Sequence, residues 1–107
     1  MSQSAVADPV LKRFRAELAT MYGAQLARVV LFGSRARGEA REDSDYDIAV
    51  FLTELPDRWA ERYRLADLRL KMLDETGAFF EARPYATSEI ESRTPLMGDI
   101  RREGIDL

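Results

Sequence analysis

Two aspartates stand one residue apart where an apolar segment begins. Asp45 and Asp47 flank Tyr46, and residues 48–50, Ile-Ala-Val, continue as a run typical of a buried strand. Because alternate side chains of a strand share a face, the two carboxylates are expected on the same face. Neighbouring carboxylates repel each other unless a cation lies between them. Alone, the pair is more typical of the solvent-exposed end of a strand than of a site for divalent metal ions.

A glycine and a serine precede the aspartates, at the end of another apolar run. Gly33 and Ser34 follow residues 28–32, which predict a buried strand. Glycine lets the backbone approach a ligand closely, and the amides and hydroxyl that follow it are suited to an anion. Arg35 and Arg37 add charge suited to phosphate. Alone, this segment is equally typical of a strand-to-helix turn, but beside the aspartates it favours a site for phosphate and metal.

The composition restricts the chemistry. The chain of 107 residues has no cysteine and no histidine, which excludes thiol nucleophiles, cysteine zinc sites and serine–histidine triads. A metal must therefore bind oxygen ligands, which points to magnesium, manganese or calcium. The formal net charge of −3 argues against stable nucleic-acid binding by this chain alone.

The amino-terminal segment and the hydropathy of the chain bear on its location. Residues 1–8 lack an apolar signal segment. No apolar run approaches the length needed to span a bilayer. We therefore expect a cytoplasmic protein without a membrane segment.

Capping residues, glycines and apolar periodicity predict the order of the elements. They predict a helix from Asp8-Pro9 to Gly23, a strand over 28–32, a helical turn over 34–37, a strand over 45–52, a helix from Pro56-Asp57 to Thr76-Gly77, a strand over 78–85, and short helices from 87 or 88 and over 95–102. This order predicts an α+β fold, a small mixed sheet backed by helices, in a single domain over residues 1–107.

The longest helix carries apolar residues at steps of three and four, a stripe expected to pack in the core. The stripe consists of Trp59, Tyr63, Ala66, Leu70, Met72 and Leu73. On this ground Trp59 and Tyr63 are predicted to be core residues rather than platforms for a base. Leu65 and Leu68 widen the stripe together with Met72, which is typical of a core and can also indicate a partner surface.

The spacing of the glycine, serine and aspartates resembles a known signature. Gly33-Ser34, ten residues and then Asp45-x-Asp47 resembles the motif of the DNA polymerase β-like nucleotidyltransferase superfamily. The fuller pattern over 33–38 and 44–47 resembles its minimal nucleotidyltransferase (MNT) branch, and residues 99–104 are similar to the end of these short proteins. The resemblance implies that Gly33 and Ser34, helped by Arg35 and Arg37, hold a triphosphate. It also implies that Asp45 and Asp47 bind two Mg²⁺ ions, with Mn²⁺ as an alternative.

A third acid on a later strand normally completes the site in this superfamily, where it binds the second metal and helps activate the acceptor hydroxyl. Glu81 is the only acid in the predicted third strand. The resemblance therefore implies a catalytic and metal-binding role for Glu81 in place of the usual aspartate. Alternatively, Glu81 belongs to the polar face of an edge strand, which Pro84 also favours.

The resemblance also implies a function. Many MNT proteins are antitoxins encoded beside a helical HEPN-domain toxin, and some inactivate it by adenylylating a tyrosine. We therefore expect a metal-dependent transfer of a nucleoside monophosphate, with ATP as donor and a HEPN-domain protein as partner. Two alternatives stay open: a weakly active or inactive protein that silences a partner by contact, and a transferase for a small molecule such as an aminoglycoside.

Overall fold

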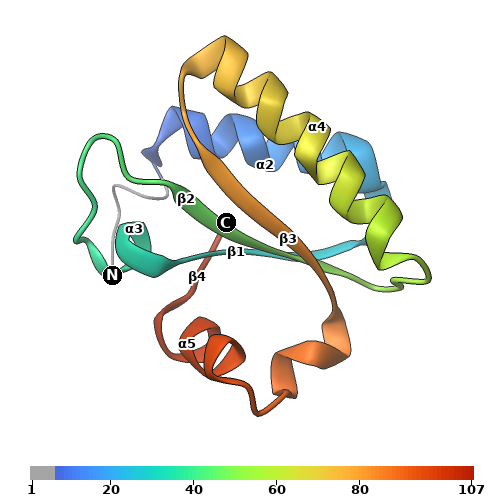
Figure 1. The fold of residues 1–107 in the computed structure, drawn as a ribbon. Helices are drawn as coiled ribbons and strands as arrows, with labels where there is room; N and C mark the ends of the chain where they lie inside the picture. The colour runs from blue at the N-terminus through green and yellow to red at the C-terminus, as the bar shows by residue number, and fades with distance from the viewer. Residues whose placement is uncertain (1–6) are drawn as a thin grey trace.

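The computed structural model describes residues 7–107 and contains a four-stranded sheet with helices on both faces (Figure 1). The strands lie in the order β3-β2-β1-β4, where β1 is Leu26–Phe32, β2 is Tyr46–Leu52, β3 is Phe80–Ala86 and β4 is Ile105–Asp106. β1 runs antiparallel to both β2 and β4, whereas β2 and β3 are parallel. The mixed sheet confirms the predicted α+β class.

The helices begin and end close to the predicted residues. They are α2 (Pro9–Tyr22), α3 (Gly33–Arg37), α4 (Arg58–Thr76) and α5 (Pro95–Glu103), with 3₁₀ turns η1 (Gly23–Gln25) and η2 (Thr87–Glu91). Asp8 caps α2 by accepting a hydrogen bond of 2.8 Å from the amide of Val10, and Asp57 caps α4 in the same way through Ala60. Figure 1 shows α2 and α4 on one side of the sheet and α5 on the other.

The two faces of the sheet form two cores because strand side chains alternate. Val29 and Leu31 of β1 belong to the core under α2 and α4, and Val30 between them packs with Met97 and Ile100 of α5. Both apolar faces are thereby covered, which explains why β1 and β2 read as continuous apolar runs.

The prediction that Trp59 and Tyr63 are core residues is wrong. Their exposed fractions are 67% and 70%, and Leu70 of the same predicted stripe is 65% exposed. Leu65, Leu68 and Met72 are instead buried against the sheet and α2. Helix α4 carries two apolar stripes on nearly opposite sides, and helical periodicity alone does not say which one packs inward.

Three smaller differences concern the end of the chain. β3 begins at Phe80 rather than at residue 78, and η2 is a 3₁₀ turn instead of an α-helix. β4 was not predicted because its two residues are too short to show a period. Within residues 7–107, no helix combines the length and the apolar composition that a membrane crossing requires. The prediction that residues 1–8 lack a signal segment falls mostly on residues 1–6, which lie outside the described part of the chain.

Candidate active site

The predicted phosphate segment and the predicted metal ligands meet at one end of the two central strands. β1 ends at Phe32, which pairs with Asp47 near the start of β2, so Gly33 lies directly beside this aspartate. Figure 1 shows α3 and the loop that enters β2 at this same end. A methyl group on Gly33 would lie 2.3 Å from Oδ2 of Asp47, and Gly33 has a φ of +76°. Only glycine leaves room for the carboxylate at this position.

Arg35 supports the loop that leads to the aspartates. Its guanidinium donates to the carbonyl of Ser44 at 2.8 and 2.9 Å and to the carbonyls of Arg41 and Glu42. It also lies over the ring of Tyr46, 3.9 Å from the ring centroid. The structure thus places Arg35 between α3 and the loop, and its predicted contact with a nucleotide stays a prediction.

Tyr46 anchors the strand residue between the two aspartates. Its hydroxyl donates to Oδ2 of Asp8 at 2.7 Å. Burial, together with this hydrogen bond and the negative charge of Asp8, raises the pKa of Tyr46 to about 12. The side chain therefore remains a neutral donor, and it ties the start of β2 to the start of α2.

Arg37 points toward the other side of α3. It pairs with Glu39 at 2.9 Å and with Glu103 of α5 at 3.2 Å, and these acidic partners raise the pKa of Arg37. Because all three side chains are at least partly exposed, the pairs are exchangeable with a phosphate. The predicted role of Arg37 in nucleotide binding is compatible with this position and stays a prediction.

Negative charge accumulates around Asp47. Asp45 is exposed just before β2, Asp47 is half-buried, and Glu81 of β3 pairs in register with Asp47. Burial raises the pKa of the Asp47 carboxyl, and the charges of Asp45 and Glu81 raise it further, against a smaller opposing effect of Arg83 and Arg37. This carboxylate is therefore disfavoured without a counter-ion, and an oxygen-only donor set of this kind suits a hard divalent cation.

Glu81 is held by an arginine that the sequence did not single out. Arg69 of α4 forms an ion pair of 3.2 Å with Glu81, and its Nε donates to the carbonyl of Phe80 at 2.6 Å. Over residues 7–107, no three acidic side chains converge as a ready-made metal cluster. The structure thus brings Glu81 beside Asp47, as predicted for a third acid, but directs its carboxylate to Arg69. No pattern in α4 marks Arg69, because the contact depends on how the helix crosses β3.

Comparison with known proteins identifies the family of the chain. Residues 11–96 match the model of the family described as "Nucleotidyltransferase domain". A protein of Methanocaldococcus jannaschii named "Putative protein adenylyltransferase MJ0141" is 40% identical over 47 residues, which cover 44% of this chain and 48% of that protein. The chain spans about half the length of the curated relatives it matches.

Solved structures share the fold. One described as "putative minimal nucleotidyltransferase" is 30% identical with a TM-score of 0.59, and the match covers 100% of this chain and 97% of that one. A chain from a complex of a tri-AMPylated Shewanella oneidensis HEPN toxin with an MNT antitoxin is 18% identical with a TM-score of 0.52, covering 89% of this chain and 66% of that one. At this identity the second likeness shows the fold alone.

Proposed function

Because this chain belongs to the nucleotidyltransferase domain family, we propose that it is a metal-dependent nucleotidyltransferase that moves AMP from ATP to an acceptor hydroxyl. The observation that carries the proposal is the contact between Gly33 and Asp47, where a methyl group would lie 2.3 Å from the carboxylate. A phosphate-binding loop and a metal-binding acid that touch each other suit a bound metal–triphosphate.

The proposed reaction is an in-line displacement. The acceptor oxygen bonds to the α-phosphorus, the bond from this phosphorus to the bridging oxygen breaks, and pyrophosphate leaves. Ser34 and Arg37 would bind the phosphates, and Glu81 would receive the acceptor proton after exchanging its ion pair with Arg69. Mg²⁺ ions held by Asp45 and Asp47 would neutralise the charge that develops on the phosphate oxygens.

We further propose that the acceptor is a HEPN-domain protein and that this chain is its antitoxin. The resemblance of residues 33–47 to the MNT branch supports this partner. The adenylyltransferase name of the relative supports transfer to a protein, and the solved complex shows an MNT antitoxin with an AMPylated HEPN toxin.

Transfer of label tests the proposal. The chain is mixed with magnesium, ATP labelled at the α-phosphate, and a HEPN-domain protein as the proposed partner. The partner should gain label and the mass of an AMP group, and the Asp45→Asn/Asp47→Asn variant should transfer none. A partner that gains neither label nor mass under these conditions would contradict the transferase proposal.

One observation supports a second candidate, a protein that silences its partner by contact. The ion pair with Arg69 engages Glu81, so the third acid of the site already has a cation. In this case the Asp45→Asn/Asp47→Asn variant should still silence the partner, although no label is transferred. Loss of silencing in that variant would exclude contact inhibition.

A further inference from the structure

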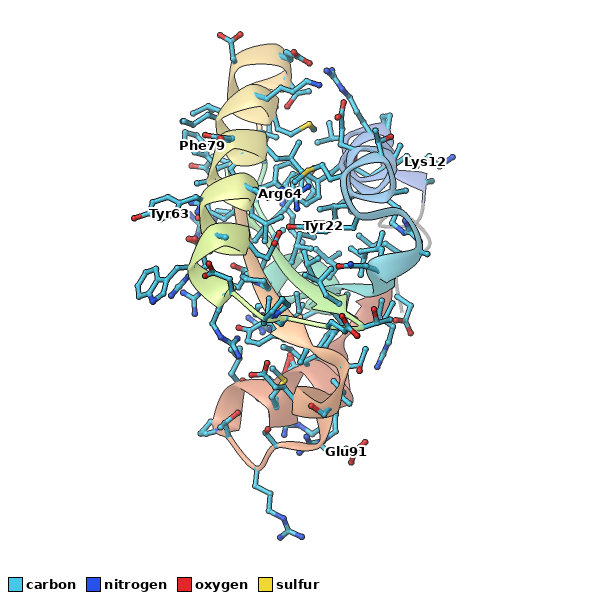
Figure 2. All side chains as sticks on the ribbon, turned by 90° about the vertical axis from the view of Figure 1, so that its right-hand side faces the viewer. Lys12, Tyr22, Tyr63, Arg64, Phe79 and Glu91 are labelled. Atoms are coloured by element: carbon cyan, nitrogen blue, oxygen red, sulfur yellow. The ribbon has the colours of Figure 1, made fainter. Side chains whose placement is uncertain are left out.

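Large apolar side chains gather on the outer side of α4. Within residues 7–107 the strongly exposed large hydrophobic residues are Trp59 (67%), Tyr63 (70%), Leu70 (65%) and Phe79 (55%). The first three belong to α4, and Phe79 directly precedes β3. Figure 2 shows Tyr63 and Phe79 on the same side of the molecule, away from α2. We call these four residues the α4 outer face.

Three residues of the α4 outer face form a second apolar stripe on α4. The first apolar stripe of this helix packs against the core. At about 100° per residue, Trp59, Tyr63 and Leu70 point within roughly 40° of one another. The buried residues Leu65, Leu68 and Met72 lie on the opposite side and contact the core. A helix that packs on one side is normally polar on the other, and grouped exposed aromatic residues indicate an interaction surface.

A groove in this face is suited to an apolar side chain. It has a volume of about 250 Å³ and lies between α4 and the start of β3. Its lining residues are Ala66, Arg69, Leu70, Leu73, Phe79 and Phe80. An aliphatic or aromatic anchor seated in such a pocket is the usual energetic centre of a protein interface.

The groove is continuous with the candidate active site through one residue. Arg69 lines the groove and also forms the ion pair of 3.2 Å with Glu81. Glu81 in turn pairs in register with Asp47. A partner that fills the groove therefore contacts the side chain that holds the third acid, at the edge strand nearest the site.

Charged residues flank the α4 outer face on both sides. Arg58 and Arg69 lie on the β3 side, where they donate to the carbonyls of Pro84 and Phe80 and form ion pairs with Glu89 and Glu81. The spacing of Arg62 places it on the same flank. Exposed aspartates at 67 and 74 lie on the other flank. If two copies of α4 packed antiparallel, arginine flank would meet arginine flank, whereas in a parallel pair the arginine flank would meet the two aspartates. Charge therefore disfavours an antiparallel pair of copies but not a parallel one. The position of the groove favours the acceptor over a second copy, because the groove adjoins Arg69 and Glu81 at the edge of the site that an acceptor has to reach.

We propose that the α4 outer face docks the acceptor protein. The acceptor presents an amphipathic helix that places an apolar side chain in the groove and an acidic side chain beside Arg62. Docking there brings the rest of the acceptor to the β3 edge, beside Glu81 and Asp47. The inference rests on the proposed function for the identity of the acceptor, the HEPN-domain protein, but not on the transfer of AMP.

Paired variants of neighbouring residues test the docking surface. Tyr63→Ser/Leu70→Ser removes the apolar contacts, and Arg64→Ser/Lys71→Ser is the matched control on the exposed side of α4 that faces α2. Affinity for the same HEPN-domain protein that serves in the label-transfer experiment is measured by calorimetry without ATP. The outer-face variant should bind about 10- to 100-fold more weakly, as expected for interface anchors, and the control should bind like the unaltered chain.

Several results would overturn the inference. One is that the outer-face variant binds the HEPN-domain protein as tightly as the unaltered chain does, and another is that the unaltered chain does not bind it. A third is that this chain forms a dimer that the outer-face substitutions dissociate, while the affinity for the HEPN-domain protein stays the same. Thermal unfolding of both variants establishes that each is folded. Label transfer, measured on the same samples, separates the two proposals. Docking without transfer by the unaltered chain contradicts only the transferase, and transfer with unchanged affinity in the outer-face variant contradicts only the docking surface.

Discussion

Gly33 and Gly77 have the same φ angle but different surroundings. Alanine substitutions at the two positions therefore separate the cost of this φ from the cost of the contact with Asp47. Both have a φ of +76°, where an alanine costs about 1–2 kcal/mol. A methyl group on Gly77 meets nothing within 4 Å, so this strain should be the whole cost. On Gly33 the methyl group would lie 2.3 Å from Oδ2 of Asp47, which must move away. Overpacking of this kind adds about 1–3 kcal/mol.

Urea unfolding of the two variants measures this difference. Gly33→Ala should lower the free energy of unfolding by about 2–5 kcal/mol and Gly77→Ala by about 1–2 kcal/mol. In an Asp47→Ala background the extra cost of Gly33→Ala should disappear, because the crowded carboxylate is gone. Equal costs at the two glycines, or an extra cost that persists without Asp47, would refute the contact between the phosphate loop and the metal ligand.

Three further predictions follow from the site and from α4. Because burial and the charges of Asp45 and Glu81 raise the pKa of Asp47, its ionised form disfavours folding, so Asp47→Asn should stabilise the metal-free protein by about 0.5–1 kcal/mol at neutral pH. The difference in thermal unfolding temperature between the Asp47→Asn variant and the unaltered chain should disappear at acidic pH, where Asp47 is protonated. A variant that is less stable than the unaltered chain at neutral pH would contradict the raised pKa of Asp47. Arg69→Gln should tighten Mn²⁺ binding by up to about fivefold, because the partly exposed ion pair with Glu81 competes with the metal by about 0.2–1 kcal/mol. The affinity is measured by paramagnetic titration, and an unchanged affinity would mean that Glu81 is not a metal ligand. Trp59, the only tryptophan and 67% exposed, should show the red-shifted, iodide-quenched fluorescence of a solvated indole, and a blue-shifted, protected emission would place it back in the core.

The sequence predicted the features of the fold that depend on residues close together in the chain. Asp8 and Asp57 cap the helices as expected, and the glycine–serine and aspartate segments lie where two strands end and begin. These features depend on neighbours in the chain, so residue types and spacing are enough to find them. The pairing of Glu81 with Asp47 depends on the register of two parallel strands. The sequence predicted which segment forms the third strand, but not which of its residues lies beside Asp47.

What the sequence did not reveal depends on tertiary contacts. Trp59 and Tyr63 were placed in the core because helical spacing identifies a stripe but not the direction in which it faces. Arg35 and Arg69 are engaged by a loop and by an edge strand, and their partners depend on tertiary placement. Charged side chains with several rotatable bonds reach many partners, so their type alone predicts a charge and not a contact.

Titration of ATP with magnesium into the unaltered chain and into the Asp45→Asn/Asp47→Asn variant tests most directly whether the phosphate segment and the aspartates form one nucleotide–metal site. Thermal unfolding is followed at each ATP concentration, with a parallel series in which magnesium is chelated. A ligand that binds only the folded chain should stabilise it by about 2.7 kcal/mol at a hundred times its dissociation constant. The account predicts this gain for the unaltered chain with magnesium, and no gain for the variant or without the metal. Equal stabilisation of the variant would contradict it.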